Sequence, residues 1–366
     1  MMKYEKLTPI ELLRELSLAF GPSGCEGNVR DIIKEYVTPY ADEIIEDKLG
    51  SLVAVYKRRV DPAPYAIDDE PVNPDGKPDV SRLMLQAHMD EVGFMIKSVT
   101  KDGYLKIAAL SGKDPRTLAA RNVTVGDEDR KTIGYFGLKP THLGGTGEFK
   151  DLYIDIGAKD RDDALSRVQI GDFGTYRSDF VVFGENDTKI KGKALDDRLG
   201  CAILCLVLRH LSETKAALPF DVCFAFTCRE EIGGTSAQTA ANLIDPDMAI
   251  CLESTAVNDL SGDCCGYVGR QGEGGCLSFM DRATIYDKEL YEFIMEVGRS
   301  RNIPVQSKNY VSGGNDARVI NRSLAGVRVA ALSAPSRYIH TASNVIDVRD
   351  YNAMTELLKA VIAALA

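Results

Sequence analysis

The sequence predicts an α/β protein with a small all-β domain inserted into it. Strand-like and helix-like segments alternate before residue 92 and after residue 185, which is typical of a largely parallel sheet with helices on both faces. Between them, short strand-like pieces alternate with Gly, Asp and Thr turns, and amphipathic helix is expected only around residues 160–168. We therefore expect one domain from residues 1–92 and 185–366, and an inserted β domain or barrel over residues 93–184.

Length and composition indicate an ordinary globular chain. Its 366 residues suffice for two domains, or one large one, and for a core that needs no disulfide or structural metal. Hydrophobic residues make up 45% and charged residues 27%, which excludes wholesale disorder. The net charge of -10 would repel phosphate backbones and anionic lipids, so we expect no binding to nucleic acid or membranes.

Three further features predict a cytoplasmic protein. The longest apolar run, residues 201–208, is far shorter than the roughly 20 residues of a membrane-spanning helix. Residues 1–20 carry charges where a signal peptide would have its apolar core. The nine cysteines form no CxxC pair, and several lie within apolar runs, as free thiols of a reducing compartment do. We do not expect a cysteine-rich zinc site.

Each predicted element has a local signal. Thr8 followed by Pro9 indicates a capped helix start, and residues 61–80, with five prolines, indicate an exposed loop. The expected helices cover residues 9–20, 28–36, 198–211, 234–243, 288–299, a segment after Gly314, and 351–365. The expected strands of the α/β part lie within residues 43–57 and over 82–87, 219–228, 248–252 and 326–333. The strand-like pieces of the inserted part are 103–110, 122–126, 132–138, 151–157 and 179–184.

Side chains with metal-binding or acid–base chemistry follow several predicted strands. His88 and His340 each come directly after one, Glu230 and Glu231 follow another, and Glu253 follows a third. In an open α/β sheet, ligands bind beyond the carboxyl ends of the strands, so we expect these side chains to converge at one edge. A single such residue is commonly structural, whereas the five together favour a functional site.

Two motifs add aspartates to this set. In AHMDEVGF, Asp90 lies two residues after His88 on the same side of an extended chain, where it can accept the second ring N–H of a metal-bound imidazole. In GKALDDRLG, Asp196 and Asp197 stand just before a predicted helix, either as site residues or as helix N-caps.

The adjacent glutamates of TCREEIGG are expected to have different roles. In an extended chain the side chains of Glu230 and Glu231 diverge, so one can bind metal while the other faces substrate. Two solvated charges at a strand end are the alternative. By contrast, His142 and His210 have no acidic neighbourhood in the sequence, and we expect neither to bind metal.

The candidate ligands form a nitrogen and oxygen donor set without cysteine. Such a set suits Zn²⁺, Co²⁺ or Mn²⁺. The candidates exceed what one catalytic zinc ion needs, and they fit two divalent ions that share a carboxylate and hold both the attacking water and the substrate oxygen.

The motifs AHMDEVGF, GKALDDRLG, TCREEIGG, CLESTA and SRYIHT, in this order, resemble the M42 family of metallo-aminopeptidases, which includes deblocking, glutamyl and tetrahedral aminopeptidases. DPRTL, DLYIDIGA and GGND extend the resemblance over nearly the whole chain. It implies a zinc-peptidase-like dinuclear domain with an inserted PDZ-like domain. By position, the resemblance assigns one metal to His88, Asp196 and Glu253, and the other to Asp196, Glu231 and His340, with Asp196 bridging. It makes Glu230 the general base and Asp90 the residue that orients His88.

The function implied by this resemblance is a dinuclear metal-dependent aminopeptidase acting on short peptides with a free N-terminus. Members of the family assemble into homo-oligomers, including tetrahedral dodecamers, and the inserted domain is where much of the contact is expected. A small β domain with exposed strand edges also favours association, because such edges tend to need covering.

Other functions remain open from the residues alone. A deacylase or carboxypeptidase could use the same metal core, and the paired Glu230 and Glu231 leave a glycoside hydrolase open, although such enzymes need two carboxyls ~5–9.5 Å apart across the sugar. A binding module without activity is disfavoured, because every expected site position is filled. The chain departs from the family pattern in having Glu253 where many relatives have Asp, in the long 61–80 segment, and in Cys264–Cys265.

Overall fold

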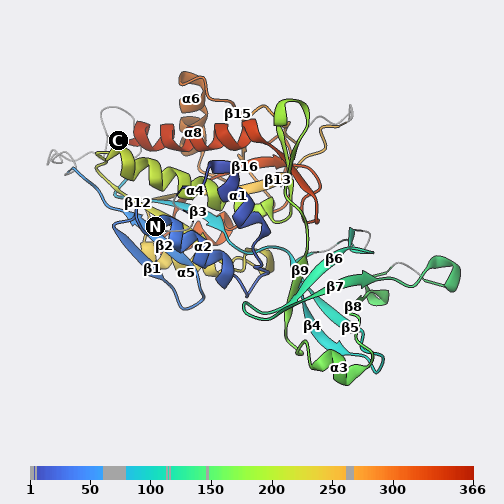
Figure 1. Cartoon of the computed structure of the whole chain (residues 1–366). Helices are drawn as coiled ribbons and strands as arrows, with labels where there is room; N and C mark the ends of the chain where they lie inside the picture. Colours follow the sequence, from blue (N-terminus) through green and yellow to red (C-terminus); the bar gives the residue numbers. More distant parts are fainter. Residues whose placement is uncertain are drawn as a thin grey trace.

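The computed structural model describes residue 4 and residues 6–60, 80–112, 114, 117–145, 148–260 and 268–366. An α/β body carries a β-barrel that extends away from it (Figure 1), which confirms the predicted fold class. The predicted 61–80 loop, apart from Val80, and the Cys264–Cys265 pair lie outside the described residues. The boundaries predicted for the two domains stay a prediction.

The body is built on an eight-stranded mixed sheet. From edge to edge its strands are β1 (Glu43–Glu46), β2 (Leu52–Tyr56), β12 (Asp221–Thr227), β3 (Arg82–His88), β13 (Met248–Ala256), β16 (Arg328–Ser336), β14 (Gly275–Leu277) and β15 (Val305–Ser307). The central strands β12, β3, β13 and β16 are parallel to one another. β2 joins β12, and β14 joins β16, in antiparallel pairs. The carboxyl ends of the four parallel strands therefore share one edge.

Helices cover both faces of this sheet, because its central strands are apolar on both sides. Along β3, Leu83, Leu85 and Ala87 pack into one cluster, whereas Met84 packs into the other. The first cluster includes residues of α1 (Pro9–Leu18), α2 (Gly27–Val37), α4 (Leu195–Thr214), α6 (Lys288–Ser300) and α8 (Val348–Leu365). The second includes residues of α5 (Thr235–Ile244) and α7 (Ala317–Ile320). Each predicted helix of the body is thus present.

The predicted helix start at Thr8 is confirmed. The Glu11 N–H donates to the Thr8 hydroxyl at 3.3 Å, and the Thr8 N–H donates to the Glu11 carboxylate at 2.8 Å. These reciprocal bonds form a capping box, with Pro9 as the first helical residue.

The inserted segment forms a closed six-stranded barrel with a core of its own. In order around the barrel the strands are β4 (Gly93–Val99), β5 (Leu105–Leu110), β8 (Tyr153–Asp155), β7 (Lys131–Gly137), β6 (Asn122–Gly126) and β9 (Phe173–Tyr176). Phe94 and Phe136 meet edge to face in this core, with ring centroids 5.4 Å apart. The expected helix near residues 160–168 is the shorter α3 (Arg161–Leu165).

Two expectations about the inserted part are corrected. The strand-like piece at residues 179–184 does not join the barrel: β10 (Val181–Phe183) pairs with β11 (Lys189–Gly192), which pairs with β17 (Asn344–Asp347) in a separate sheet. Exposed strand edges were also expected, whereas the strands close into a barrel, in which β5 and β8 pair at Leu105 and Ile154.

A buried ion-pair network on Glu91 joins barrel and body. Glu91 lies between β3 and β4, and its Oε1 atom is 2.5 Å from the Lys193 Nζ and 3.6 Å from the Arg198 Nη2. Its Oε2 accepts a hydrogen bond of 2.8 Å from the Thr175 hydroxyl of β9. The entry to the barrel and its last strand are therefore fixed to the start of α4.

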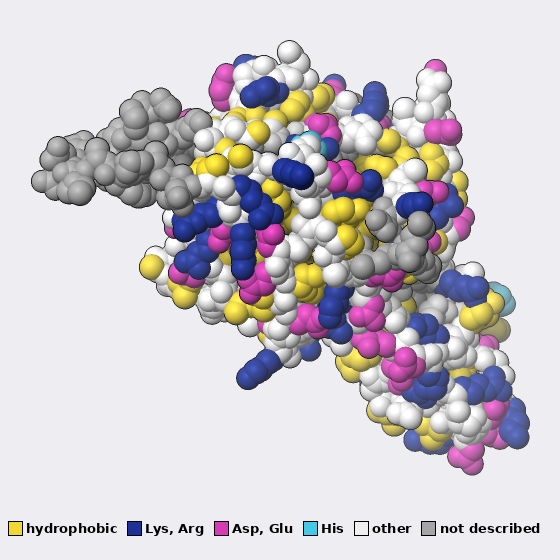
Figure 2. Space-filling view, turned by 60° about the vertical axis from the view of Figure 1, so that its left-hand side comes forward, with side chains coloured by type: hydrophobic (Ala, Val, Ile, Leu, Met, Phe, Trp, Pro, Cys, Tyr) yellow, Lys and Arg dark blue, Asp and Glu magenta, His cyan; other side chains and the backbone are white. Residues whose placement is uncertain are grey.

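The visible surface mixes basic and acidic side chains over both the body and the barrel (Figure 2). Among the helices that the structure describes, none combines the length and the apolar character that crossing a membrane requires.

Candidate metal centre

The parallel strands bring the predicted ligands to one edge of the sheet. His88 is the last residue of β3, Glu253 lies in β13, Glu231 follows β12, and His340 follows β16. Asp196 is the second residue of α4, the helix that packs on β3 and β13. The structure thus brings together all five side chains that were predicted as ligands.

These side chains form two groups that share one carboxylate. In the first, the His88 Nε2 lies 3.5 Å from the Asp196 Oδ1 and 3.7 Å from the Glu253 Oε2. In the second, the His340 Nε2 lies 3.0 Å from the Asp196 Oδ2 and 3.5 Å from the Glu231 Oε1. Within each group the candidate ligand atoms lie within 4.8 Å of one another. The two oxygens of Asp196 therefore face different imidazoles.

The buried oxygens of this site fit a bound cation. Among the described residues, Asp196 Oδ1, Glu231 Oε1 and Glu253 Oε1 are buried without a hydrogen-bond partner. A buried carboxylate oxygen is costly unless a hydrogen bond or a cation compensates it. Two imidazoles with carboxylates are also the donor set that zinc, cobalt and manganese bind in proteins. The residues present are therefore suited to hold a divalent metal.

The pKa shifts of these side chains indicate an excess of negative charge among them. Burial raises the pKa of Glu231 and, more strongly, that of Glu253. Burial lowers the pKa of His340, but the hydrogen bond with Asp196 and the charge of Glu231 outweigh it and raise that pKa to about 9. These carboxylates therefore stabilise the protonated form of the His340 imidazole.

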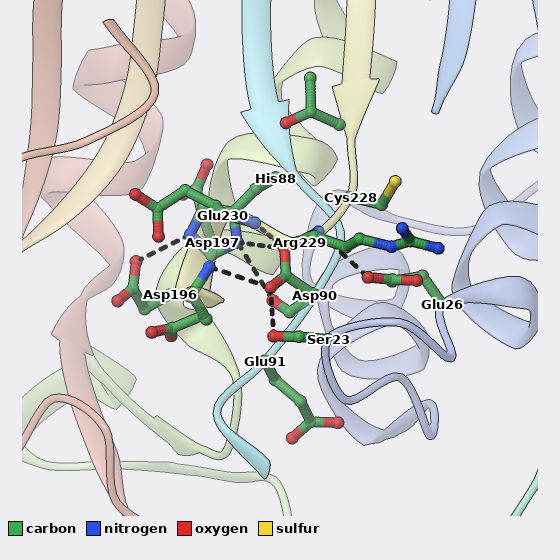
Figure 3. Close-up of polar contacts among 12 residues, drawn as sticks. Ser23, Glu26, His88, Asp90, Glu91, Asp196, Asp197, Cys228, Arg229 and Glu230 are labelled. Atoms are coloured by element: carbon green, nitrogen blue, oxygen red, sulfur yellow. Dashed lines mark hydrogen bonds and ion pairs between the residues drawn. The ribbon is translucent and has the colours of Figure 1, made fainter. Parts of the chain in front are cut away.

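Asp90 contacts both His88 and the loop that carries Glu230 and Glu231 (Figure 3). Its carbonyl oxygen is 3.1 Å from the His88 Nδ1, and its Oδ1 is 3.4 Å from the same nitrogen. The carboxylate also accepts from the Ser23 hydroxyl at 2.6 Å and from the N–H groups of Glu230 and Glu231 at 2.9 and 3.1 Å. Although burial opposes ionisation, the contacts with His88 and Ser23 lower the pKa of Asp90.

Glu230 belongs to neither ligand group. It opens the short 3-10 helix Glu230–Ile232, directly before Glu231. Burial, together with the charges of Asp316 and Glu231, raises the pKa of Glu230 well above that of an exposed glutamate. The site therefore offers a carboxyl group that can hold a proton beside the candidate ligands.

Of the two roles considered for Asp196 and Asp197, helix cap and site residue, each residue matches one. Asp197 accepts the N–H of Gly200 at 3.1 Å, as a capping carboxylate does. A methyl group on Gly200 would lie 2.2 Å from the Asp197 carboxylate, so glycine is needed there. Asp196, in contrast, faces the imidazoles.

Two polar side chains near this site, Ser111 and Asp316, were not among the predicted site residues, although Asp316 lies in the GGND motif. The Ser111 hydroxyl, after the barrel strand β5, donates to the Glu231 Oε2 at 2.7 Å. The buried Asp316 accepts from Gln86 at 2.7 Å and from Thr227 at 2.8 Å, behind the loop that carries Glu230. The neighbouring sequence does not indicate what these residues contact, because their partners are distant in the sequence.

His142 and His210 belong to neither of the two groups. His142 is in the short 3-10 helix Thr141–Leu143 of the barrel segment, and His210 is on α4 near its end. Burial lowers the pKa of His210.

A small cavity of about 10 Å³ lies next to the second group. It lies where the barrel meets the body. Its lining residues are Glu91, Val92, Tyr176, Ala194, Asp196, Glu231, His340, Thr341 and Asn344.

Known proteins share this chain's sequence and fold. The family model described as M42 glutamyl aminopeptidase matches residues 72–357. The lysyl aminopeptidase of Pyrococcus furiosus is 29% identical, with 97% of each protein covered. The structure of the TET aminopeptidase from the marine sediment archaeon Thaumarchaeota archaeon SCGC AB-539-E09 matches with a TM-score of 0.87 and 32% identity, covering 98% of this chain and 99% of that one.

A further solved structure is that of the Pyrococcus horikoshii TET1 peptidase, described as assembling into a tetrahedron or a large octahedral shell. It matches with a TM-score of 0.81 and 28% identity, covering 97% of this chain and 99% of that one. The family match spans most of the chain and includes every candidate ligand. The chain therefore belongs to the M42 peptidase family and is an aminopeptidase, a hydrolase of peptide bonds.

Proposed function

We propose that this protein is a dinuclear metal-dependent aminopeptidase that removes the N-terminal residue from short peptides in the cytoplasm. The main support for this proposal is the position of Asp196. Its Oδ1 lies 3.5 Å from the His88 Nε2, and its Oδ2 lies 3.0 Å from the His340 Nε2. A carboxylate placed in this way suits a bridge between two ions. Glu253 completes one ligand set with His88, and Glu231 completes the other with His340.

Zn²⁺ or Co²⁺ is the proposed cofactor, with Mn²⁺ as a third candidate, because imidazole and carboxylate donors suit these ions. When bound, two such ions supply an acidified water near neutral pH and positive charge for the oxyanion that develops during peptide hydrolysis.

Glu230 is the proposed general base. Its carboxylate accepts the proton of the attacking water and then donates that proton to the departing amine. Its position supports this role, because it lies directly before Glu231 but belongs to neither ligand group. Asp90 supports the assignment by holding the Glu230 N–H and the His88 ring together.

The alternatives are less well supported by the site. A deacylase or carboxypeptidase would use the same metal core, but the first would require an acylated amine and the second a free C-terminal carboxylate. A glycoside hydrolase would need a second free carboxyl facing Glu230. Glu231 is instead engaged by His340 and Ser111, and the two histidines would have no role.

We also propose that the chain forms a homo-oligomer, with a tetrahedral dodecamer as the specific form. The assembly described for the Pyrococcus horikoshii TET1 peptidase supports it. Size-exclusion chromatography with light scattering is expected to give a mass of twelve times the 40.0 kDa monomer. A stable dimer would discard the dodecamer, and a monomer at micromolar concentration would overturn association altogether.

Chelation tests the proposed activity. EDTA is expected to abolish hydrolysis of aminoacyl-p-nitroanilides, and Zn²⁺, Co²⁺ or Mn²⁺ added back should restore it. Matched peptides with free and N-acetylated termini separate an aminopeptidase from a deacylase. Undiminished activity after chelation, or a preference for the acetylated peptide, would contradict the proposal.

Two isosteric variants test the division of labour between the neighbouring glutamates. Glu230→Gln removes the proposed base but no ligand, so kcat should fall about 100-fold or more while metal content is retained. Glu231→Gln removes a proposed ligand and should lose occupancy of one metal, as measured by elemental analysis. The same metal loss in both variants would show that the roles are wrongly assigned.

A further inference from the structure

The loop that carries Glu230 and Glu231 is held by carboxylates. The strand β12 ends at Thr227. Two residues later, at Arg229, the backbone enters the left-handed region, with a φ of 62°. The N–H groups of Arg229, Glu230 and Glu231 then each donate to a carboxylate oxygen of a distant residue. The position of this loop therefore depends on the residues that supply those oxygens.

Asp90 supplies two of the acceptors and Glu26 supplies the other. The N–H groups of Glu230 and Glu231 donate to Asp90 at 2.9 and 3.1 Å, and the Arg229 N–H donates to the Glu26 Oε1 at 3.1 Å. Figure 3 shows Asp90 and Glu26 approaching the loop from two different chain segments. Asp90 follows β3, whereas Glu26 precedes α2.

Glu26 is built into the body. Only 6% of its surface is exposed, and the oxygen that accepts from Arg229 also accepts the Gly24 N–H at 2.7 Å. Burial raises the pKa of this carboxyl to about 7. Burying a carboxyl group costs free energy, which its hydrogen bonds must offset. In the same segment, Ser23 donates to Asp90.

We propose that Glu26 is a positioning residue for peptide hydrolysis: by accepting the Arg229 N–H, it fixes the loop in which Glu230 and Glu231 face the metal centre. The inference rests on the proposed function for the roles of these two glutamates. Glu26 itself acts only through the backbone of Arg229.

Three substitutions of Glu26 separate the effect of its side-chain length from the effect of its charge. Glu26→Gln keeps a carbonyl oxygen at the same distance from the backbone and loses the charge. Glu26→Asp keeps the charge, but its side chain is shorter by one methylene. Glu26→Ala removes the acceptor. Asp31→Ala is the control, because Asp31 is an exposed aspartate of α2, the helix that begins directly after Glu26.

Hydrogen exchange of the full-length protein as purified measures the contact without turnover. Mass spectrometry of peptides spanning residues 228–232 should show at least ten-fold faster exchange at the Arg229 amide in Glu26→Ala and Glu26→Asp. Glu26→Gln and Asp31→Ala should exchange like the wild type. Because neither metal nor substrate is needed, this result stands even if the proposed metal-dependent mechanism fails.

Kinetics test the consequence. Misplacing a base by a fraction of an ångström lowers the rate of the chemical step more than substrate binding. We expect kcat to fall at least ten-fold in Glu26→Ala and Glu26→Asp, with KM changed less than two-fold and with kcat retained in Glu26→Gln. Wild-type exchange and kcat in Glu26→Asp would overturn the proposal, as would a Glu26→Gln variant impaired like Glu26→Asp. If Glu26→Ala does not fold, the comparison of Gln with Asp still decides.

Discussion

The site depends on burying several carboxyl groups around two imidazoles. Such a concentration of negative charge in a poorly solvated place is costly unless cations or hydrogen bonds compensate it. Asp90 is compensated by a hydroxyl and two backbone N–H groups. Asp196, Glu231 and Glu253 each keep a buried oxygen without a hydrogen-bond partner. Hydrogen bonds thus compensate Asp90, whereas each of these three carboxylates, which face the imidazoles, has one oxygen that no hydrogen bond compensates.

Three neighbouring residues, at the end of β3 and directly after it, contact different parts of the site and of the barrel. His88 faces Asp196 and Glu253, Asp90 holds the loop after β12, and Glu91 is fixed by Lys193 and by Thr175 of the barrel. Because side chains alternate along an extended chain, His88 and Asp90 share a side while Glu91 points elsewhere. The two candidate ligand groups, the loop after β12 and the barrel are therefore connected through side chains of residues 88–91.

Local sequence patterns predicted the parts of the molecule that local chemistry determines. Apolar runs ending in His or Glu located the central strands and the candidate ligands, and Thr8–Pro9 located the first helix. Contacts between distant segments had no such signal. The Glu26 contact with Arg229 joins residues 203 apart in sequence, and the closure of the barrel and the pairing of β10 with β11 also depend on tertiary partners. Ser111, which donates to Glu231 from the barrel segment, was missed for the same reason.

Asp196 is proposed to bridge two metal ions. Crystals of the protein loaded with Co²⁺, measured at the cobalt absorption edge, test it most directly by anomalous scattering. We expect two peaks, one between Asp196, His88 and Glu253 and one between Asp196, Glu231 and His340, about 3.5–4 Å apart. A single peak, or peaks that do not contact Asp196, would contradict a shared carboxylate and with it the dinuclear mechanism.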